Sequence, residues 1–242
     1  MRKRVQQRHA RWWSLVAAAI CGAFAVGFVA LPALSGEVSV AREYAPVGPD
    51  RVNEPTNSIS KQTLQAKLAY CEECHGPSAR GFHGYYPIPR LAGQQIEYLQ
   101  NQLRAFVEHR RTNNIMFHVS RVLSPEMIEA LATNLHDFNP KPLGGAKREL
   151  FAKGKEIYEA GITDKNVPAC SSCHGDDAKG NGPFPRLAGQ LFDYTSSKLT
   201  NWDKERGQDP GDPDSSATMQ PIARSLADAE IKAIAAYLSE LE

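Results

Sequence analysis

The sequence predicts an all-α fold made of two tandem units, with an apolar helix ahead of them. The hexapeptide PRLAGQ occurs at residues 89–94 and again at residues 185–190. The segment after each copy places apolar residues at three- and four-residue steps, which is the periodicity of an amphipathic helix. A repeat of this kind indicates a duplicated structural unit. The apolar helix is predicted from an uncharged run between Trp12 and Leu34.

This apolar run follows a basic N-terminus and is 23 residues long. A membrane-spanning helix needs about 20 apolar residues, whereas the core of a signal peptide has about 7–15. The basic cluster is expected to stay in the cytoplasm. We therefore expect residues 1–36 to be a single-pass anchor in the bacterial inner membrane, with the globular part in the periplasm. The alternative is a signal peptide cut near Ser35, which would leave a soluble periplasmic protein.

The charge distribution excludes one class of partner. The whole chain has a formal net charge of +1, but residues 1–36 hold five basic residues and no acidic one. The remainder therefore carries 23 basic and 27 acidic residues. A nucleic-acid-binding surface needs a basic stripe or patch, so we expect no nucleic-acid partner.

The motif C-x-x-C-H occurs twice, as CEECH at 71–75 and as CSSCH at 170–174. This motif indicates covalent attachment of c-type haem. Residues three and four apart share one face of a helix, so two thiols and one imidazole can reach the same porphyrin. The sequence therefore predicts two covalently attached haem c groups. The predicted attachment residues and iron ligands are Cys71, Cys74 and His75 in the first copy and Cys170, Cys173 and His174 in the second.

Two other uses of paired cysteines fit this spacing poorly. A zinc site built from two C-x-x-C pairs has about 15–20 residues between the pairs, whereas 95 residues separate Cys74 from Cys170. Redox-active and structural disulfides do not require the histidine that follows each pair.

The repeat can be traced from these motifs to the end of the chain. Helices are expected at residues 93–106 and 189–202, where the alignment pairs Tyr98 with Tyr194 and Arg110 with Arg206. Closing amphipathic helices are expected at SPEMIEALATNLHDF and ADAEIKAIAAYLSEL, the first capped by Ser124. The Pro/Gly-rich segment NPKPLGGA separates the copies. The predicted organisation is an anchor at 1–36, a linker at 37–60, domain 1 at 61–140, a linker at 141–146 and domain 2 at 147–242.

The sixth iron ligand can be inferred by comparing the two units. Met219 is the only Met after His174, and no His follows His174. The offset between the closing helices is 103, which makes Met116 the counterpart of Met219. Methionine opposite histidine is an arrangement of electron-transfer haems. We therefore expect Met116 and Met219 as ligands, with His118 as the alternative in domain 1 and Met127 as a core residue.

The chain resembles the dihaem cytochromes c of the cytochrome c4 family. The likeness is carried by CEECH and CSSCH, by GKEIYEAG, by the paired PRLAGQ and by the two matched methionines, over roughly residues 61–242. It implies two class I cytochrome c domains related by an approximate two-fold axis. It also implies that the carbonyls of Pro89 and Pro185 accept hydrogen bonds from the iron-binding imidazoles. Arg90 and Arg186 would pair with haem propionates, or would be ordinary solvated charges.

The resemblance also implies a function. It predicts a carrier of electrons in the periplasm, from the cytochrome bc complex to a haem-copper oxidase, with no catalysis of its own. One alternative is the cytochrome subunit of a periplasmic dehydrogenase, such as a sulfide-oxidising flavoenzyme. Another is a dihaem enzyme, such as a peroxidase or a thiosulfate dehydrogenase, although two matched methionines favour a carrier.

Overall fold

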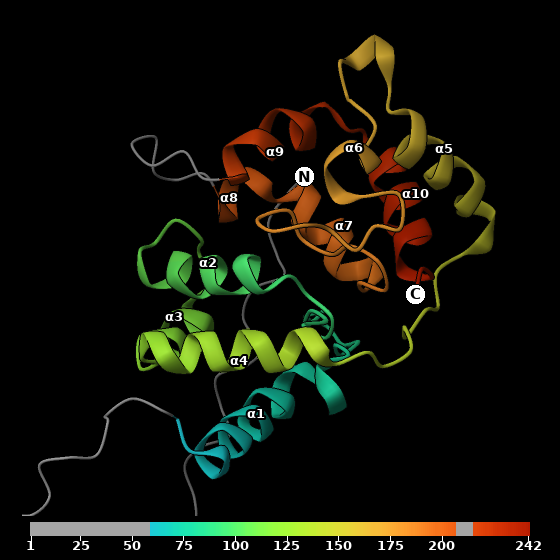
Figure 1. Ribbon diagram of the computed structural model, residues 1–242. Coiled ribbons are helices and arrows are strands. Elements are labelled where there is room, and N and C mark those ends of the chain that lie inside the picture. The colour runs from blue at the N-terminus through green and yellow to red at the C-terminus, as the bar shows by residue number, and fades with distance from the viewer. Residues whose placement is uncertain (1–58, 207–214) are drawn as a thin grey trace, which may run out of the picture. The chain divides into compact units, whose positions relative to one another are not determined.

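The computed structural model describes residues 59–206 and 215–242, and Figure 1 shows their arrangement. Every regular element within these residues is helical, and the extended pairings there are four isolated β-bridges. The predicted all-α class is therefore confirmed for the described part of the chain. No helix in that part is both long and apolar enough to span a membrane. The predicted anchor lies outside the described residues.

The first half has four α-helices, three of which meet in one apolar core. Leu68, Leu99 and Leu131 are buried together, each from a different helix. Removing such side chains from water supplies the main driving force for packing. The helices are α1 (Lys61–His75), α2 (Ile96–Val107), α3 (Asn114–Ser120) and α4 (Pro125–Asp137), with a 3₁₀ turn at Pro77–Ala79.

The second half builds a separate core of the same kind. Ile157 and Tyr158 pack with Ile234 and Leu238, and the Tyr158 hydroxyl donates a hydrogen bond to a backbone carbonyl at 2.6 Å. A buried hydroxyl is costly without such a partner. The elements are α5 (Phe151–Ala160), α6 (Ser171–His174), α7 (Phe192–Thr200), α8 (Trp202–Glu205), α9 (Ser215–Ser225) and α10 (Asp228–Ser239), with 3₁₀ turns at Arg148–Leu150 and Thr163–Lys165.

The closing helices α4 and α10 form where the sequence predicts them. Ser124 caps α4 by accepting a hydrogen bond from the backbone N–H of Met127 at 3.2 Å. The start of α10 is stabilised differently, because Glu230 accepts a hydrogen bond from the N–H of Ala227 at 2.7 Å. Both arrangements satisfy a backbone N–H at the start of a helix. Met127 is buried in the first core, as predicted.

The two C-x-x-C-H motifs lie on helices of very different length. The first ends α1, a continuous helix of 15 residues, whereas the second lies on α6, which has four. Helix α5 ends at Ala160, and the segment before α6 turns back on itself through a bridge between Ile162 and Val167. The second half therefore carries an insertion between its first helix and its attachment motif.

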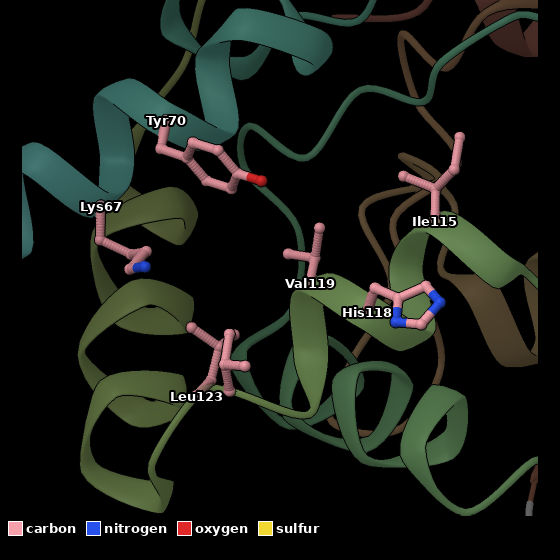
Figure 2. Close-up of a pocket in the computed structure, with 7 residues that line it drawn as sticks. Lys67, Tyr70, Ile115, His118, Val119 and Leu123 are labelled. Atoms are coloured by element: carbon pink, nitrogen blue, oxygen red, sulfur yellow. The ribbon is translucent and has the colours of Figure 1, made fainter.

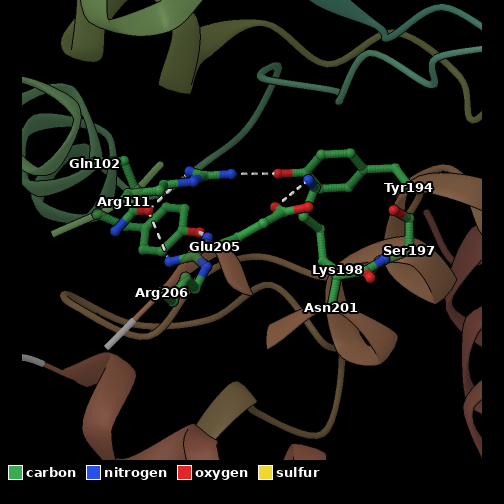
Figure 3. A network of polar contacts seen from close by, with 9 residues as sticks. Gln102, Arg111, Tyr194, Ser197, Lys198, Asn201, Glu205 and Arg206 are labelled. Carbon is green, nitrogen blue, oxygen red and sulfur yellow. Dashed lines mark hydrogen bonds and ion pairs between the residues drawn. The ribbon is translucent and has the colours of Figure 1, made fainter. Parts of the chain in front are cut away.

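The two halves contact each other through reciprocal hydrogen bonds, part of which Figure 3 shows. Arg111 of the first half donates to the hydroxyl of Tyr194 at 2.7 Å, and Arg206 of the second donates to that of Tyr98 at 3.1 Å. Both guanidinium groups also donate to Oε1 of Gln102, each at 2.8 Å. Reciprocal contacts are the pattern that a two-fold relation produces.

These contacts correct the sequence alignment at one position. The alignment pairs Arg206 with Arg110, but Arg111 is its structural counterpart. The Arg111 guanidinium lies 4.6 Å from the ring centre of Phe106, and that of Arg206 lies 4.9 Å from the equivalent aromatic ring of the second half. The first half has one residue more between ring and arginine. The extra residue is accommodated by a tight turn, in which His109 has a left-handed conformation with φ of 59°.

Replacing Gly154 by alanine should destabilise the second half. A Cβ at this position would lie 2.0 Å from the carbonyl oxygen of Ala233, where α5 crosses α10. The two helices would have to separate, and overpacking of this kind costs about 1–3 kcal/mol. The thermal unfolding midpoint of the holoprotein should therefore fall in Gly154→Ala.

The matched control is Lys155→Ala in the same helix. Lys155 is exposed and pairs with Glu159 at 3.7 Å, and exposed ion pairs contribute about 0–1 kcal/mol. Equal midpoints for the two variants would contradict the account of the helix crossing.

Candidate functional site

The four cysteines of the repeated motif occupy matched positions in the two halves. Cys71 and Cys170 are half-buried, whereas Cys74 and Cys173 are exposed. Each half-buried cysteine packs against the apolar core of its own half. Within the described residues all four are unpaired thiols, which is the number that two haems, each attached by two thioether bonds, require.

The histidine of each motif is buried and held by one backbone carbonyl. His75 is 7% exposed, and its Nδ1 lies 2.8 Å from the carbonyl oxygen of Pro89. His174 is 5% exposed, and its Nδ1 lies 3.0 Å from the carbonyl oxygen of Pro185. A carbonyl can only accept, so Nδ1 carries the proton in both rings. The other ring nitrogen, Nε2, is then the one available to a metal.

Burial keeps these side chains uncharged. It lowers the pKa of both His75 and His174, and the hydrogen bond to the proline carbonyl opposes this effect only in part. Both imidazoles are therefore neutral at pH 7, which is the form that binds a metal. Burial also raises the pKa of the Cys71 thiol, and raises that of Cys170 to about 11.

Arg90 and Arg186 are buried, so the reading of these residues as solvated surface charges is wrong. Arg90 donates to the carbonyls of Ala92 at 3.0 Å and Pro140 at 2.8 Å, and Arg186 donates to the carbonyl of Ala188 at 3.0 Å. Among the described residues, Nη2 of each arginine is buried and finds no hydrogen-bond partner. A buried unpaired donor on a charged group is costly.

The charge around Arg90 also favours an anionic partner. Burial and, to a smaller extent, the nearby charges of Arg186 and Arg80 together lower the pKa of Arg90 to about 10. A carboxylate placed among these groups would accept the unpaired hydrogen bonds and offset the repulsion. These residues therefore fit a group that carries carboxylates, such as haem.

The two predicted methionine ligands lie on corresponding helices. Met116 is half-buried near the start of α3, where its backbone N–H donates to Asn113 at 2.9 Å. Met219 is half-buried on α9. His118 is exposed, and its ring contacts that of Phe117 edge to face with centres 5.3 Å apart. The assignment of either methionine as an iron ligand remains a prediction.

A cavity of about 350 Å³ lies between α1 and the α3–α4 region, as Figure 2 shows. Tyr70 reaches into it from α1, and Val119 and His118 face it from α3. Neither His75 nor Met116 is among the residues that line this cavity. Its lining residues are Lys67, Tyr70, Ile115, His118, Val119, Val122 and Leu123.

Two glutamines that the sequence analysis did not single out lie next to the histidine-binding prolines. Gln190 of the second half binds the backbone of Arg90, and Gln94 of the first half binds the backbone of Arg186. Both are the last residue of PRLAGQ. Their identity in both copies of the hexapeptide is the feature of the sequence that could have pointed to them.

Comparison with known proteins finds the same class of molecule. The Cytochrome c family model matches residues 151–242. Cytochrome c-552 of Acidithiobacillus ferridurans is 37% identical over 71% of this chain and 73% of its own length. Cytochrome c4 of Thiocapsa roseopersicina is 38% identical over 71% and 86%. A thiosulfate dehydrogenase electron acceptor of Thiomonas intermedia is 35% identical over 72% and 79%.

Solved structures agree with these relatives. The cytochrome c4 of Acidithiobacillus ferrooxidans superimposes with a TM-score of 0.62 and 35% identity, covering 72% of this chain and 99% of that one. A thiosulfate dehydrogenase from Marichromatium purpuratum gives a TM-score of 0.62 and 29% identity, covering 71% of this chain and 36% of that one. The chain therefore belongs to the cytochrome c4 family of dihaem c-type cytochromes, electron carriers with covalently bound haem c.

Proposed function

We propose that this chain is a membrane-tethered carrier that takes electrons from the cytochrome bc complex in the periplasm and delivers them to a haem-copper oxidase. The observation that best supports the role of electron carrier is the equivalence of the two histidine environments. Each imidazole is buried, neutral and held by a proline carbonyl, and each half offers one methionine on a corresponding helix.

The residues assigned to each centre are those predicted from the sequence. Cys71, Cys74, Cys170 and Cys173 would attach the two haems, and His75, His174, Met116 and Met219 would bind the two irons. When bound, each haem supplies a centre that gains or loses one electron. The proline carbonyls would hold the imidazoles, the apolar cores would exclude water, and Arg90 and Arg186 would neutralise propionates. With a histidine and a methionine both bound, each iron would have no open position for a substrate, which would favour a carrier over an enzyme.

A second candidate donor follows from the relatives. The protein from Thiomonas intermedia is named as the electron acceptor of a thiosulfate dehydrogenase. This chain would then accept electrons from a separate enzyme of sulfur oxidation instead of from the bc complex. The haem-binding residues would be the same for both donors, so the difference lies in the surface that meets the donor.

Replacing Met116 or Met219 by alanine should alter one haem and leave the other unchanged. Loss of the sulfur ligand should remove about half of the near-infrared band that methionine gives on ferric haem, and should lower one midpoint potential, because methionine ligation raises it. The reduced variants should also bind carbon monoxide at the opened position.

His118→Ala is the control for the first half. It should leave the near-infrared band and both midpoint potentials unchanged. If His118 is the ligand instead, Met116→Ala should leave the band and both midpoint potentials unchanged, whereas His118→Ala should shift one midpoint potential.

The anchor can be tested by the intact mass of holoprotein extracted from membranes. An uncleaved anchor predicts the mass of the full chain, with or without Met1, plus two haems. It should also leave the protein in the membrane fraction after a high-salt wash, because burial of an apolar helix does not depend on ionic strength. A mass that matches a chain starting near residue 36 would contradict the proposal that the protein keeps its membrane anchor.

The two candidate donors can be separated by the rate at which the full-length holoprotein becomes reduced. Quinol and purified bc complex should reduce both haems faster than thiosulfate and a thiosulfate dehydrogenase do, at equal enzyme concentrations. Haem reduction is followed by its visible absorbance, and its rate is measured with each donor on the same preparation of the holoprotein. Fast reduction with thiosulfate alone would favour the second candidate.

A further inference from the structure

The strongest unexplained feature is a pair of glutamines that cross between the two halves. Oε1 of Gln190 accepts the backbone N–H of Arg90 at 2.9 Å, and Nε2 of Gln190 donates to the Arg90 carbonyl at 3.0 Å. Oε1 of Gln94 accepts the N–H of Arg186 at 2.6 Å, and Nε2 of Gln94 donates to the Arg186 carbonyl at 3.0 Å. Each glutamine therefore forms hydrogen bonds with both the backbone N–H and the backbone carbonyl of one arginine in the opposite half.

Each of the two glutamine side chains also accepts a hydrogen bond from the backbone of its own half. Oε1 of Gln94 also accepts the N–H of Gln95 at 2.9 Å, and Oε1 of Gln190 also accepts the N–H of Leu191 at 3.0 Å. Gln94 is 5% exposed and Gln190 is 8% exposed. Hydrogen bonds in such a low-dielectric environment polarise one another more than hydrogen bonds in water do.

The N–H of Arg90 and the carbonyl of Pro89 belong to the same peptide unit. The carbonyl end of that unit accepts the hydrogen bond from His75 at 2.8 Å, while its N–H end donates to Gln190 of the opposite half. The unit is planar and conjugated, so an acceptor at its N–H end makes its carbonyl oxygen more negative.

The same connection exists in the second half. The peptide unit between Pro185 and Arg186 accepts from His174 at its carbonyl end and donates to Gln94 at its N–H end. Each histidine is thus linked through one peptide unit to a glutamine of the other half.

We propose that Gln94 and Gln190 are positioning residues that set the reduction potential of the haem in the opposite half. A more negative proline carbonyl draws the Nδ1 proton and makes the imidazole a stronger donor to iron. A stronger donor stabilises the oxidised iron, so each glutamine lowers the potential of the haem across the interface. This inference rests on the assignment of His75 and His174 as iron ligands.

The test measures the two midpoint potentials of the full-length holoprotein carrying Gln190→Leu or Gln94→Leu. The potentials are first assigned to halves with Met116→Ala and Met219→Ala. Gln190→Leu should raise the potential of the first-half haem, and Gln94→Leu should raise that of the second-half haem. In each variant the haem of the mutated half should keep its potential.

Two further variants separate this role from loss of packing. Gln190→Glu keeps an oxygen acceptor for the Arg90 N–H, and with a protonated carboxyl it can also donate to the Arg90 carbonyl as Nε2 does, so the first-half potential should return to the wild-type value in that form. Gln95→Leu removes another contact between the halves, from Nε2 to the carbonyls of Lys179 at 2.9 Å and Gly180 at 3.2 Å. It touches neither proline peptide and should change neither potential.

The outcomes distinguish the proposal from the assignment on which it rests. Suppose that Met116→Ala and Met219→Ala each shift one potential. The proposal that each glutamine acts on the opposite haem is then wrong if a Leu variant shifts neither potential, shifts both, or shifts only the potential of the haem in its own half. If the methionine variants move nothing, the ligand assignment itself fails.

Discussion

The structure depends on two peptide units that each satisfy partners from both halves of the molecule. The unit between Pro89 and Arg90 orients a buried imidazole with its carbonyl and binds the opposite half with its N–H. Each buried hydrogen bond contributes about 1 kcal/mol net, and leaving its partner unpaired costs more. Separating the halves would therefore leave the backbone N–H groups of Arg90 and Arg186, which are next to the histidine-binding carbonyls, exposed or without a partner. Ligand geometry and the packing of the two halves are fixed by the same atoms.

This constraint explains why a hexapeptide is repeated while the loops around it differ. Within PRLAGQ the proline holds the histidine of its own half, the arginine is buried beside it, and the glutamine binds the opposite half. Three roles with fixed spacing leave little freedom within the segment. By contrast, the second half inserts a turn before α6 and ends α7 at Thr200, with a single residue between it and the start of α8. Those changes lie outside the shared contacts.

The parts that could be predicted from sequence are local in the chain. The spacing of C-x-x-C-H places the histidine beside its cysteines, and apolar periodicity located α4 and α10 with their buried faces. Contacts of the glutamines could not be predicted in this way, because they join residues 92 to 100 positions apart. The register at Arg111 was missed because one extra residue in a turn disturbs no periodic pattern. Burial of Arg90 was undecided since composition does not reveal which charged residues lie inside.

The most direct test of this account is hydrogen exchange at the backbone N–H of Arg90 and Arg186 in the full-length holoprotein. Internal references are the N–H groups of Leu91 and Leu187, which donate to carbonyls of their own halves at 2.9 and 2.8 Å. If the halves are held together as described, the arginine and leucine amides exchange equally slowly, through unfolding of the whole unit. Fast exchange at the two arginines beside protected leucines would show that the halves separate while each stays folded, and would contradict the account.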